Sequence, residues 1–126
     1  MEINPAFFSV TYGAGGATRD KTLEVVDLIQ RGREIPTMAL LTCVGSTSDV
    51  ISIFLTDESD RGISNILALR GDPPPGQNVF VKPEGGFEFS YELVEYIRTL
   101  GQFGIGVAGF PEGHIACTEG REVDWD

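Results

Sequence analysis

The chain has few of the residues on which several classes of protein depend. Only two of its 126 residues are cysteines, Cys43 and Cys117, which lie far apart and form no C-x-x-C pair. That usage argues against a disulfide framework and favours free thiols in a reducing cytoplasm. The single histidine, His114, lies near Cys117, but two ligands without further Cys or His do not make a metal centre. No metal is therefore expected.

Basic residues are also scarce. Nine Lys and Arg stand against nineteen Asp and Glu, which gives a formal net charge of −10. This balance argues against nucleic acid as a partner, because binding a polyanion requires basic side chains that neutralise phosphates. One Arg with backbone amides can still hold a single phosphate or pyrophosphate.

Long apolar runs are missing too. None approaches the roughly 20 residues that cross a bilayer, so no membrane association is expected. Residues 1–5 show no basic segment followed by an apolar one, and hence no secretory signal. With 41% hydrophobic and 22% charged residues, the composition is that of an ordinary globular protein. We expect one cytoplasmic domain over residues 1–126.

What the chain does contain is a repeated strand-then-helix unit. Runs of apolar, aromatic or β-branched residues predict strands at residues 7–12, 37–42, 65–69 and 105–109.

Helices are predicted between these strands. One covers residues 19–31, carries Val25, Val26 and Ile29, and ends at Gly32. A second follows the N-cap candidates of residues 46–49 and carries Val50, Ile53 and Phe54. A third covers residues 91–100 with Leu93, Val94 and Ile97, and a last one begins near Glu122.

The predicted strands are continuous apolar runs, which indicates burial on both faces of a parallel sheet covered by helices. A doubly wound sheet and a parallel β/α (TIM-type) barrel both satisfy this pattern, which leans slightly towards the barrel. Four βα units make half of a barrel that typically needs about 250 residues. We therefore expect an incomplete barrel that forms a homo-oligomer or requires the missing half, because its sheet edges are open.

Ligand sites of parallel β/α folds lie at the carboxyl ends of the strands. Residues 11–13, 42–43, 70–72 and 110–114 should therefore share one edge. Arg70 could pair with a phosphate, and Asp72 could bind a heterocycle or stabilise a developing positive charge. Alternatively, Arg70 and Asp72 form a local ion pair, or the strand ends are polar only because they meet solvent. Cell adhesion through Arg-Gly-Asp fits poorly without a secretory signal.

Four ordered motifs resemble the methylenetetrahydrofolate reductase family. They are S-V-T-Y-G-A-G-G-x-T-R-D at residues 9–20, L-T-C-V-G at 41–45, N-I-L-A-L-R-G-D-P-P at 65–74 and G-V-A-G-F-P-E-G-H at 106–114. The resemblance covers essentially the whole chain. It implies a β/α barrel that holds FAD and reduces 5,10-methylenetetrahydrofolate to 5-methyltetrahydrofolate with hydride from NADH or NADPH.

The resemblance also assigns roles to residues. Thr11 resembles the residue near flavin N5 and the nicotinamide. Asp72 resembles the acid beside flavin and folate that stabilises the cationic iminium substrate. These two are the expected catalytic residues, and Asp72 is the expected folate contact. The expected FAD contacts are Thr11, Tyr12, Ala14, Arg70, Gly71, Asp72, Ser90, Phe110, His114, Cys117 and Asp124.

Several departures from the family pattern affect the expected activity. The first-strand Glu that acts as general acid would precede Met1, and a Lys-Val-Asp-Ala-Gly segment would follow Asp126. Leu40 stands where a flavin-contacting His is usual, and Phe110 where Tyr is common. Loss of a general acid commonly costs about 10²–10⁴-fold in rate. A non-catalytic half-barrel that binds flavin or phosphate with a partner chain is therefore the alternative.

Overall fold

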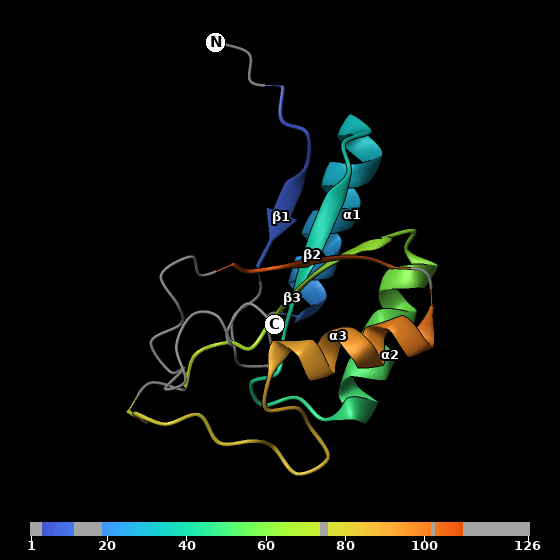
Figure 1. The fold of residues 1–126 in the computed structure, drawn as a ribbon. Helices are drawn as coiled ribbons and strands as arrows, with labels where there is room; N and C mark the ends of the chain where they lie inside the picture. The colour runs from blue at the N-terminus through green and yellow to red at the C-terminus, as the bar shows by residue number, and fades with distance from the viewer. Residues whose placement is uncertain (1–3, 12–18, 74–75, 102, 110–126) are drawn as a thin grey trace.

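The structure is a computed structural model, and it describes residues 4–11, 19–73, 76–101 and 103–109. Strands and helices alternate along these residues (Figure 1). The elements in chain order are β1 (Phe8–Val10), α1 (Arg19–Arg33), β2 (Thr37–Thr42), α2 (Ser48–Asp60), β3 (Asn65–Leu69), α3 (Ser90–Leu100) and β4 (Gly104–Val107).

The four strands form one parallel sheet whose spatial order is the chain order, β1-β2-β3-β4. In register, Leu40 of β2 lies opposite Leu67 of β3, which lies opposite Gly106 of β4. A doubly wound sheet reverses its strand order at a switch point, whereas a barrel wall adds each new strand to the same edge. The observed order is that of a barrel wall and confirms the predicted fold class.

The helices cover one face of this sheet. Along β2, Thr37, Ala39 and Leu41 are fully buried, while the alternate residues are only half-buried. One hydrophobic cluster joins Ala39 and Leu41 to buried side chains of all three helices, namely Val26, Ile51, Phe54, Leu55, Leu93 and Ile97. Figure 1 shows α1 beside β2, and α2 in contact with α3.

The opposite face of the sheet, here called the inner face, carries Met38, Leu40, Thr42, Leu67 and Leu69. These residues are half-buried in the described part of the chain. The prediction of burial on both faces is therefore wrong for this structure. The physical reason is that helices cover a barrel wall only from outside, so its inner face depends on other strands.

Several strand and helix boundaries differ from the predicted ones. β1 is limited to three residues and leaves Phe7 54% exposed, and β4 runs from Gly104 to Val107 rather than from 105 to 109. The prediction that α1 ends at Gly32 is wrong. The helix continues to residue 33, and Glu34 takes the left-handed position with φ 53° while its N–H donates to the Gln30 carbonyl at 3.2 Å. Pro36, which cannot continue a helix, follows closely.

The predicted apolar helix faces are partly right. Val26, Phe54, Leu93 and Ile97 are buried as expected. Their neighbours Val25 and Ile53 are 44% and 71% exposed, because adjacent helical residues point about 100° apart. Thr47, within the predicted cap region, is the N-cap of α2 and accepts a hydrogen bond from the Val50 N–H at 3.4 Å. The helix predicted near Glu122 lies outside the described residues.

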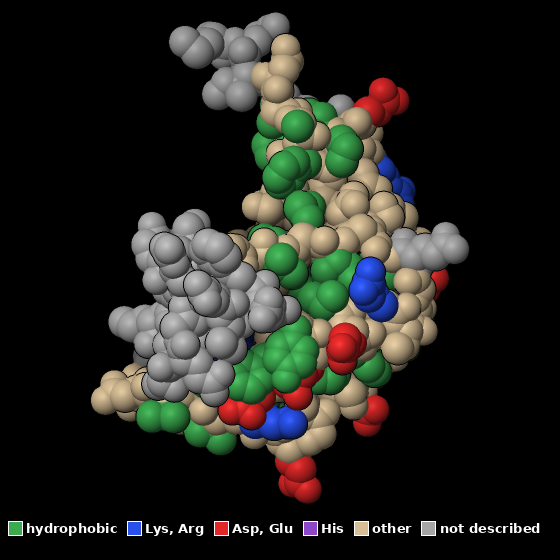
Figure 2. All heavy atoms as spheres, in the orientation of Figure 1, with side chains coloured by type: hydrophobic (Ala, Val, Ile, Leu, Met, Phe, Trp, Pro, Cys, Tyr) green, Lys and Arg blue, Asp and Glu red, His purple; other side chains and the backbone are tan. Residues whose placement is uncertain are grey.

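Hydrophobic side chains reach the surface over β1, as Figure 2 shows in its upper part. Phe7 and Phe8 are 54% and 36% exposed there. At the other edge of the sheet Val107 is 59% exposed. Both edge strands therefore present apolar side chains in the described structure. Within that part of the chain, no helix combines the length and apolarity needed to span a membrane.

Candidate functional site at the carboxyl edge of the sheet

Polar residues gather where the parallel strands end. Arg70, Gly71 and Asp72 directly follow β3, Thr11 directly follows β1, and Thr42 is the last residue of β2. Because paired parallel strands point the same way, these residues lie on one edge, here called the carboxyl edge. Thr11 and Asp72 are exposed, whereas Arg70, Gly71 and Thr42 are half-buried. The structure thus places five of these residues at one edge of the sheet, while the predicted site residue Ser90 lies at the start of α3.

Arg70 is held by an aromatic ring rather than by a carboxylate. Its guanidinium carbon lies 5.3 Å from the centroid of the Phe80 ring. The ion pairs among the described residues are Arg31–Asp27 and Arg61–Asp57, and Arg70 forms none with Asp72. The alternative of a local Arg70–Asp72 ion pair is therefore wrong. Since no described carboxylate neutralises this half-buried cation, the position suits an anionic ligand.

Gly71 makes the turn between these two side chains. Its φ is +85°, and an added Cβ would lie 3.1 Å from both Thr42 Cβ and Val44 Cγ2. Directly after β2, the Cys43 N–H donates to the carbonyls of Leu69 and Arg70, each at 3.1 Å. These contacts fix the backbone that carries Arg70 and Asp72 against the end of β2.

Cys43 is the titratable group buried beneath this edge. Its thiol donates to the Phe89 carbonyl at 3.6 Å. Burial, helped by the negative charge of Glu92 and opposed by Arg70, raises the pKa of the thiol to about 11. Cys43 is therefore protonated at neutral pH and is not suited to nucleophilic chemistry.

The long connection from β3 to α3 is tied back to the start of α2. Thr47 forms an antiparallel bridge with Gly86, and the Ser48 N–H donates to the Gly85 carbonyl at 2.8 Å. The Tyr96 hydroxyl donates to the Ser48 carbonyl at 3.2 Å. A Cβ on Gly86 would lie 2.6 Å from the Ser46 carbonyl oxygen, so only glycine fits there without a shift. The connection is thereby fixed beside the carboxyl edge.

Ser90 is the first residue of α3 and is half-buried. The helix start is fixed by Glu92, whose carboxylate accepts from the N–H groups of Glu88 and Phe89 at 2.8 and 3.0 Å. These two bonds lower the pKa of Glu92. The exposed rings of Phe89 and Tyr91, the sequence neighbours of Ser90, stack on each other, with centroids 5.7 Å apart. Glu92 therefore fixes Ser90 through the backbone.

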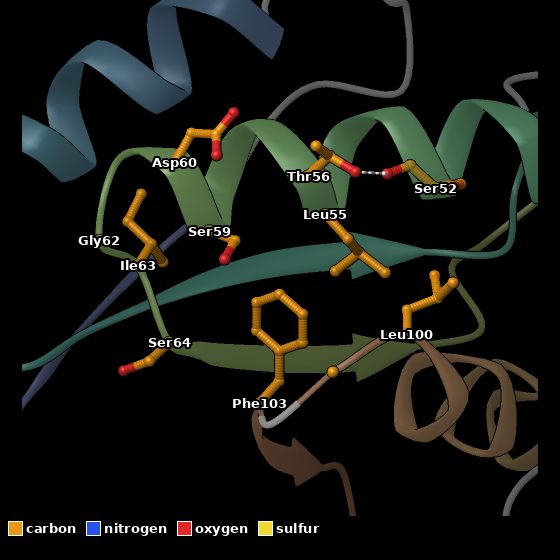
Figure 3. A pocket seen from close by; sticks show the side chains of 11 residues that line it. Ser52, Leu55, Thr56, Ser59, Asp60, Gly62, Ile63, Ser64, Leu100 and Phe103 are labelled. Carbon is orange, nitrogen blue, oxygen red and sulfur yellow. Dashed lines mark hydrogen bonds between the residues drawn. The ribbon is translucent and has the colours of Figure 1, made fainter.

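A cavity of about 450 Å³ lies at the opposite edge, where β3 and β4 begin (Figure 3). Its apolar lining in the close view consists of Leu55, Ile63, Leu100 and Phe103. Among the residues that the structure describes, its polar lining consists of hydroxyl groups and Asp60, with no Lys, Arg or His. A cavity without a cation, and with one acid, is poorly suited to a phosphorylated cofactor. The carboxyl edge is therefore the better candidate for an anionic ligand.

The remaining predicted site residues lie outside the described residues. They are Tyr12, Ala14, Phe110, His114, Cys117 and Asp124, and their roles stay predictions. Leu40, for which the resemblance predicted a departure from a flavin-contacting His, is half-buried on the inner face opposite Leu67. Within the described ranges, no group of three His, Cys, Asp or Glu residues could hold a metal ion.

Two residues of interest were not predicted from the sequence. Phe80 contacts Arg70 from a Pro/Gly-rich connection that the patterns of strand and helix do not place. Glu58 is fully buried on α2, and its two carboxylate oxygens have no hydrogen-bond partner among the described residues. Glu58 follows Leu55 by three residues and Phe54 by four, and this helical spacing could have indicated that it shares their buried face.

Comparison with known proteins settles the ancestry. A sequence model of the methylenetetrahydrofolate reductase family matches residues 1–126. The chain belongs to the methylenetetrahydrofolate reductase family. It is 45% identical over 119 residues to methylenetetrahydrofolate reductase (NADH) 1 of Zea mays, covering 93% of this chain and 20% of the maize protein.

Relatives from other kingdoms match the same methylenetetrahydrofolate reductase segment. The 5,10-methylenetetrahydrofolate reductase of Escherichia coli is 37% identical over 112 residues, covering 89% of this chain and 36% of that protein. Methylenetetrahydrofolate reductase 1 of Schizosaccharomyces pombe is 42% identical over 112 residues, covering 87% and 18%. The chain thus spans about a fifth to a third of the length of these relatives, and the resemblance found in its motifs is confirmed.

Proposed function

We propose that this chain forms part of an FAD-dependent oxidoreductase that reduces 5,10-methylenetetrahydrofolate to 5-methyltetrahydrofolate with NADH or NADPH, in one-carbon and methionine metabolism. Family membership supports the reaction. The structural observation that carries the proposal is the carboxyl edge, where Thr11, Arg70 and Asp72 follow parallel strands.

The described residues fit the anionic half of FAD. The guanidinium N–H donors of Arg70 pair with no described carboxylate, so they can bind a phosphate. Gly71 makes the turn that follows, and it has no side chain. When bound, FAD supplies the two-electron carrier between the nicotinamide donor and the folate. Arg70 would hold a phosphate of the cofactor, and the Ser90 hydroxyl would contact its adenosine side.

Asp72 would stabilise the cationic form of the substrate. Its carboxylate is exposed at the carboxyl edge and unpaired with Arg70, so its negative charge is available to a ligand there. An iminium cation is formed when the imidazolidine ring of the folate opens, and a nearby fixed carboxylate lowers the energy of that charge. Thr11 would lie beside the reacting atoms with its hydroxyl as hydrogen-bond donor.

The test is the visible absorption spectrum of the purified chain after incubation with excess FAD and removal of free ligand. We expect a retained flavin band that bleaches when a nicotinamide donor is added. NADH is tried first, because the name of the maize relative specifies NADH. A colourless protein would contradict cofactor binding by this chain alone.

We also propose that the chain acts together with further barrel strands, from a second copy or from a partner chain, in the cytoplasm. The half-buried apolar inner face and the exposed side chains of Phe7 and Val107 support this. A parallel sheet with uncovered apolar surface tends to associate. If the chain binds no flavin alone, we propose that it is a half-barrel that contributes the carboxyl edge with Arg70 to an assembly.

A further inference from the structure

The connection from β3 to α3 presents one side chain inward. Val79 and Val81 are 70% and 71% exposed, whereas Phe80 between them is half-buried and packs against the hydrophobic core cluster. The segment thus packs its aromatic ring against the core and leaves both valines in solvent.

The ring of Phe80 meets the guanidinium of Arg70 at 5.3 Å from its centroid. A cation held against a ring face is attracted by the ring quadrupole and uses none of its N–H donors in that contact. No described carboxylate pairs with Arg70. The ring can therefore fix the guanidinium while leaving its donors for an anion.

The far end of the same connection is fixed independently. The Thr47–Gly86 bridge and the bond from the Ser48 N–H to the Gly85 carbonyl tie it to the start of α2. Phe80 thus packs against the core cluster within a connection whose far end is anchored. A ring in a fixed position gives Arg70 a fixed support.

We propose that Phe80 is a positioning residue, whose ring holds the Arg70 guanidinium at the carboxyl edge so that its N–H donors meet the pyrophosphate of the dinucleotide cofactor. This inference rests on the proposed function. It assigns to the β3–α3 connection a part in cofactor binding that Phe80 exerts through Arg70.

The first test compares FAD affinity by quenching of flavin fluorescence. We expect Phe80→Leu, which keeps an apolar side chain but removes the ring face, to weaken binding about three- to tenfold. Phe80→Trp should bind as the unsubstituted chain does, because it keeps a ring. The matched control Val81→Ala, at an exposed position of the same segment, should change nothing. Phe80→Leu should add no loss to Arg70→Ala, since both act through one contact.

The second test reads Arg70 directly, from the NMR signal of its Nε–H group. The Phe80 ring current should displace this signal, and Phe80→Leu should remove the displacement. Sodium pyrophosphate should shift the signal in the unsubstituted chain and in Phe80→Trp, but much less in Phe80→Leu.

The two proposals fail in different ways. If the unsubstituted chain binds FAD and Phe80→Leu binds it equally well, or if its loss adds to that of Arg70→Ala, the role of Phe80 is overturned while the proposed function stands. If FAD does not bind but pyrophosphate shifts the Arg70 signal in a Phe80-dependent way, cofactor binding by this chain alone is overturned and the role of Phe80 at Arg70 stands. If neither ligand affects Arg70, both are overturned.

Discussion

At the scale of single residues, Gly71 combines a left-handed backbone with close packing. Its φ is +85°, and a Cβ would crowd Thr42 and Val44 at 3.1 Å. Gly76 has a similar φ of +89° with nothing within 4 Å of an added Cβ. We expect Gly71→Ala to cost about 2–4 kcal/mol in unfolding free energy, and Gly76→Ala about 1–2 kcal/mol, because only Gly71 adds steric crowding to backbone strain. Urea denaturation of both variants measures this, and equal costs would contradict the crowding.

A second residue-scale prediction concerns Asp72. In a completed barrel we expect Asp72→Ala to lower the rate of folate reduction about 10²-fold, because the substrate cation loses its carboxylate. Flavin binding should change little, since Asp72 is exposed and forms no ion pair with Arg70. The measurements are turnover with the folate substrate and FAD affinity by titration. Glu95→Ala, at an exposed position of α3, is the control, and equal losses of rate and affinity in Asp72→Ala would exclude this role.

At the scale of elements, α2 carries a carboxyl group on its buried face. Burial raises the pKa of Glu58 to about 7, with Asp57 adding to the shift and Arg61 opposing it. The folded state therefore binds more protons than the unfolded state between about pH 4.5 and 7. In that window the stability falls as the pH rises, by about 3 kcal/mol in all.

Glu58→Gln should remove this dependence. We expect the variant to be about 1–3 kcal/mol more stable than the unsubstituted chain at pH 8, where Glu58 would otherwise be ionised, and similar to it at pH 4.5. Urea midpoints across that pH range measure the difference. An unchanged slope of stability against pH would show that Glu58 does not titrate in the folded chain in this range.

Glu92 at the start of α3 should behave in the opposite sense. Its pKa is lowered by hydrogen bonds from the N–H groups of Phe89 and Glu88. Its contribution to stability is therefore present above the pKa of the unfolded chain and lost as the pH falls through the folded value. We expect Glu92→Gln to destabilise the chain by about 1 kcal/mol at pH 7 and by less at pH 3. Denaturation at the two pH values tests this, with Glu95→Gln as the control.

The elements also show what sequence patterns can predict. β2 and β3 match their predicted bounds because apolar runs between turn residues define them locally. The end of α1 was predicted wrongly at Gly32, which lies inside the helix. A helix ends where tertiary packing and the next proline require, and not at its first glycine. The carboxyl-edge placement of Arg70 follows from parallel topology and was predictable. The contact with Phe80 was not, since an irregular connection carries no periodicity.

At the scale of the whole molecule, the inner face should govern self-association. Leu67 lies on that face and is half-buried, whereas the adjacent Ile66 is fully buried under the helices. We expect the chain to elute above its 13.6 kDa mass, and Leu67→Lys to shift it towards the monomer with little loss of fold. Ile66→Lys should instead unfold it, because an unpaired charge enters the core. Light scattering with circular dichroism measures both, and a monomeric unsubstituted chain would contradict the prediction.

The strand order has a consequence for synthesis. Each described strand after β1 pairs with the strand that precedes it in the chain, so it finds that neighbour already synthesised. A chain emerging from the ribosome, at about 5–20 residues per second, can add each strand and helix to a template already in place. The described sheet grows in the direction of translation, and each new strand joins the edge opposite β1.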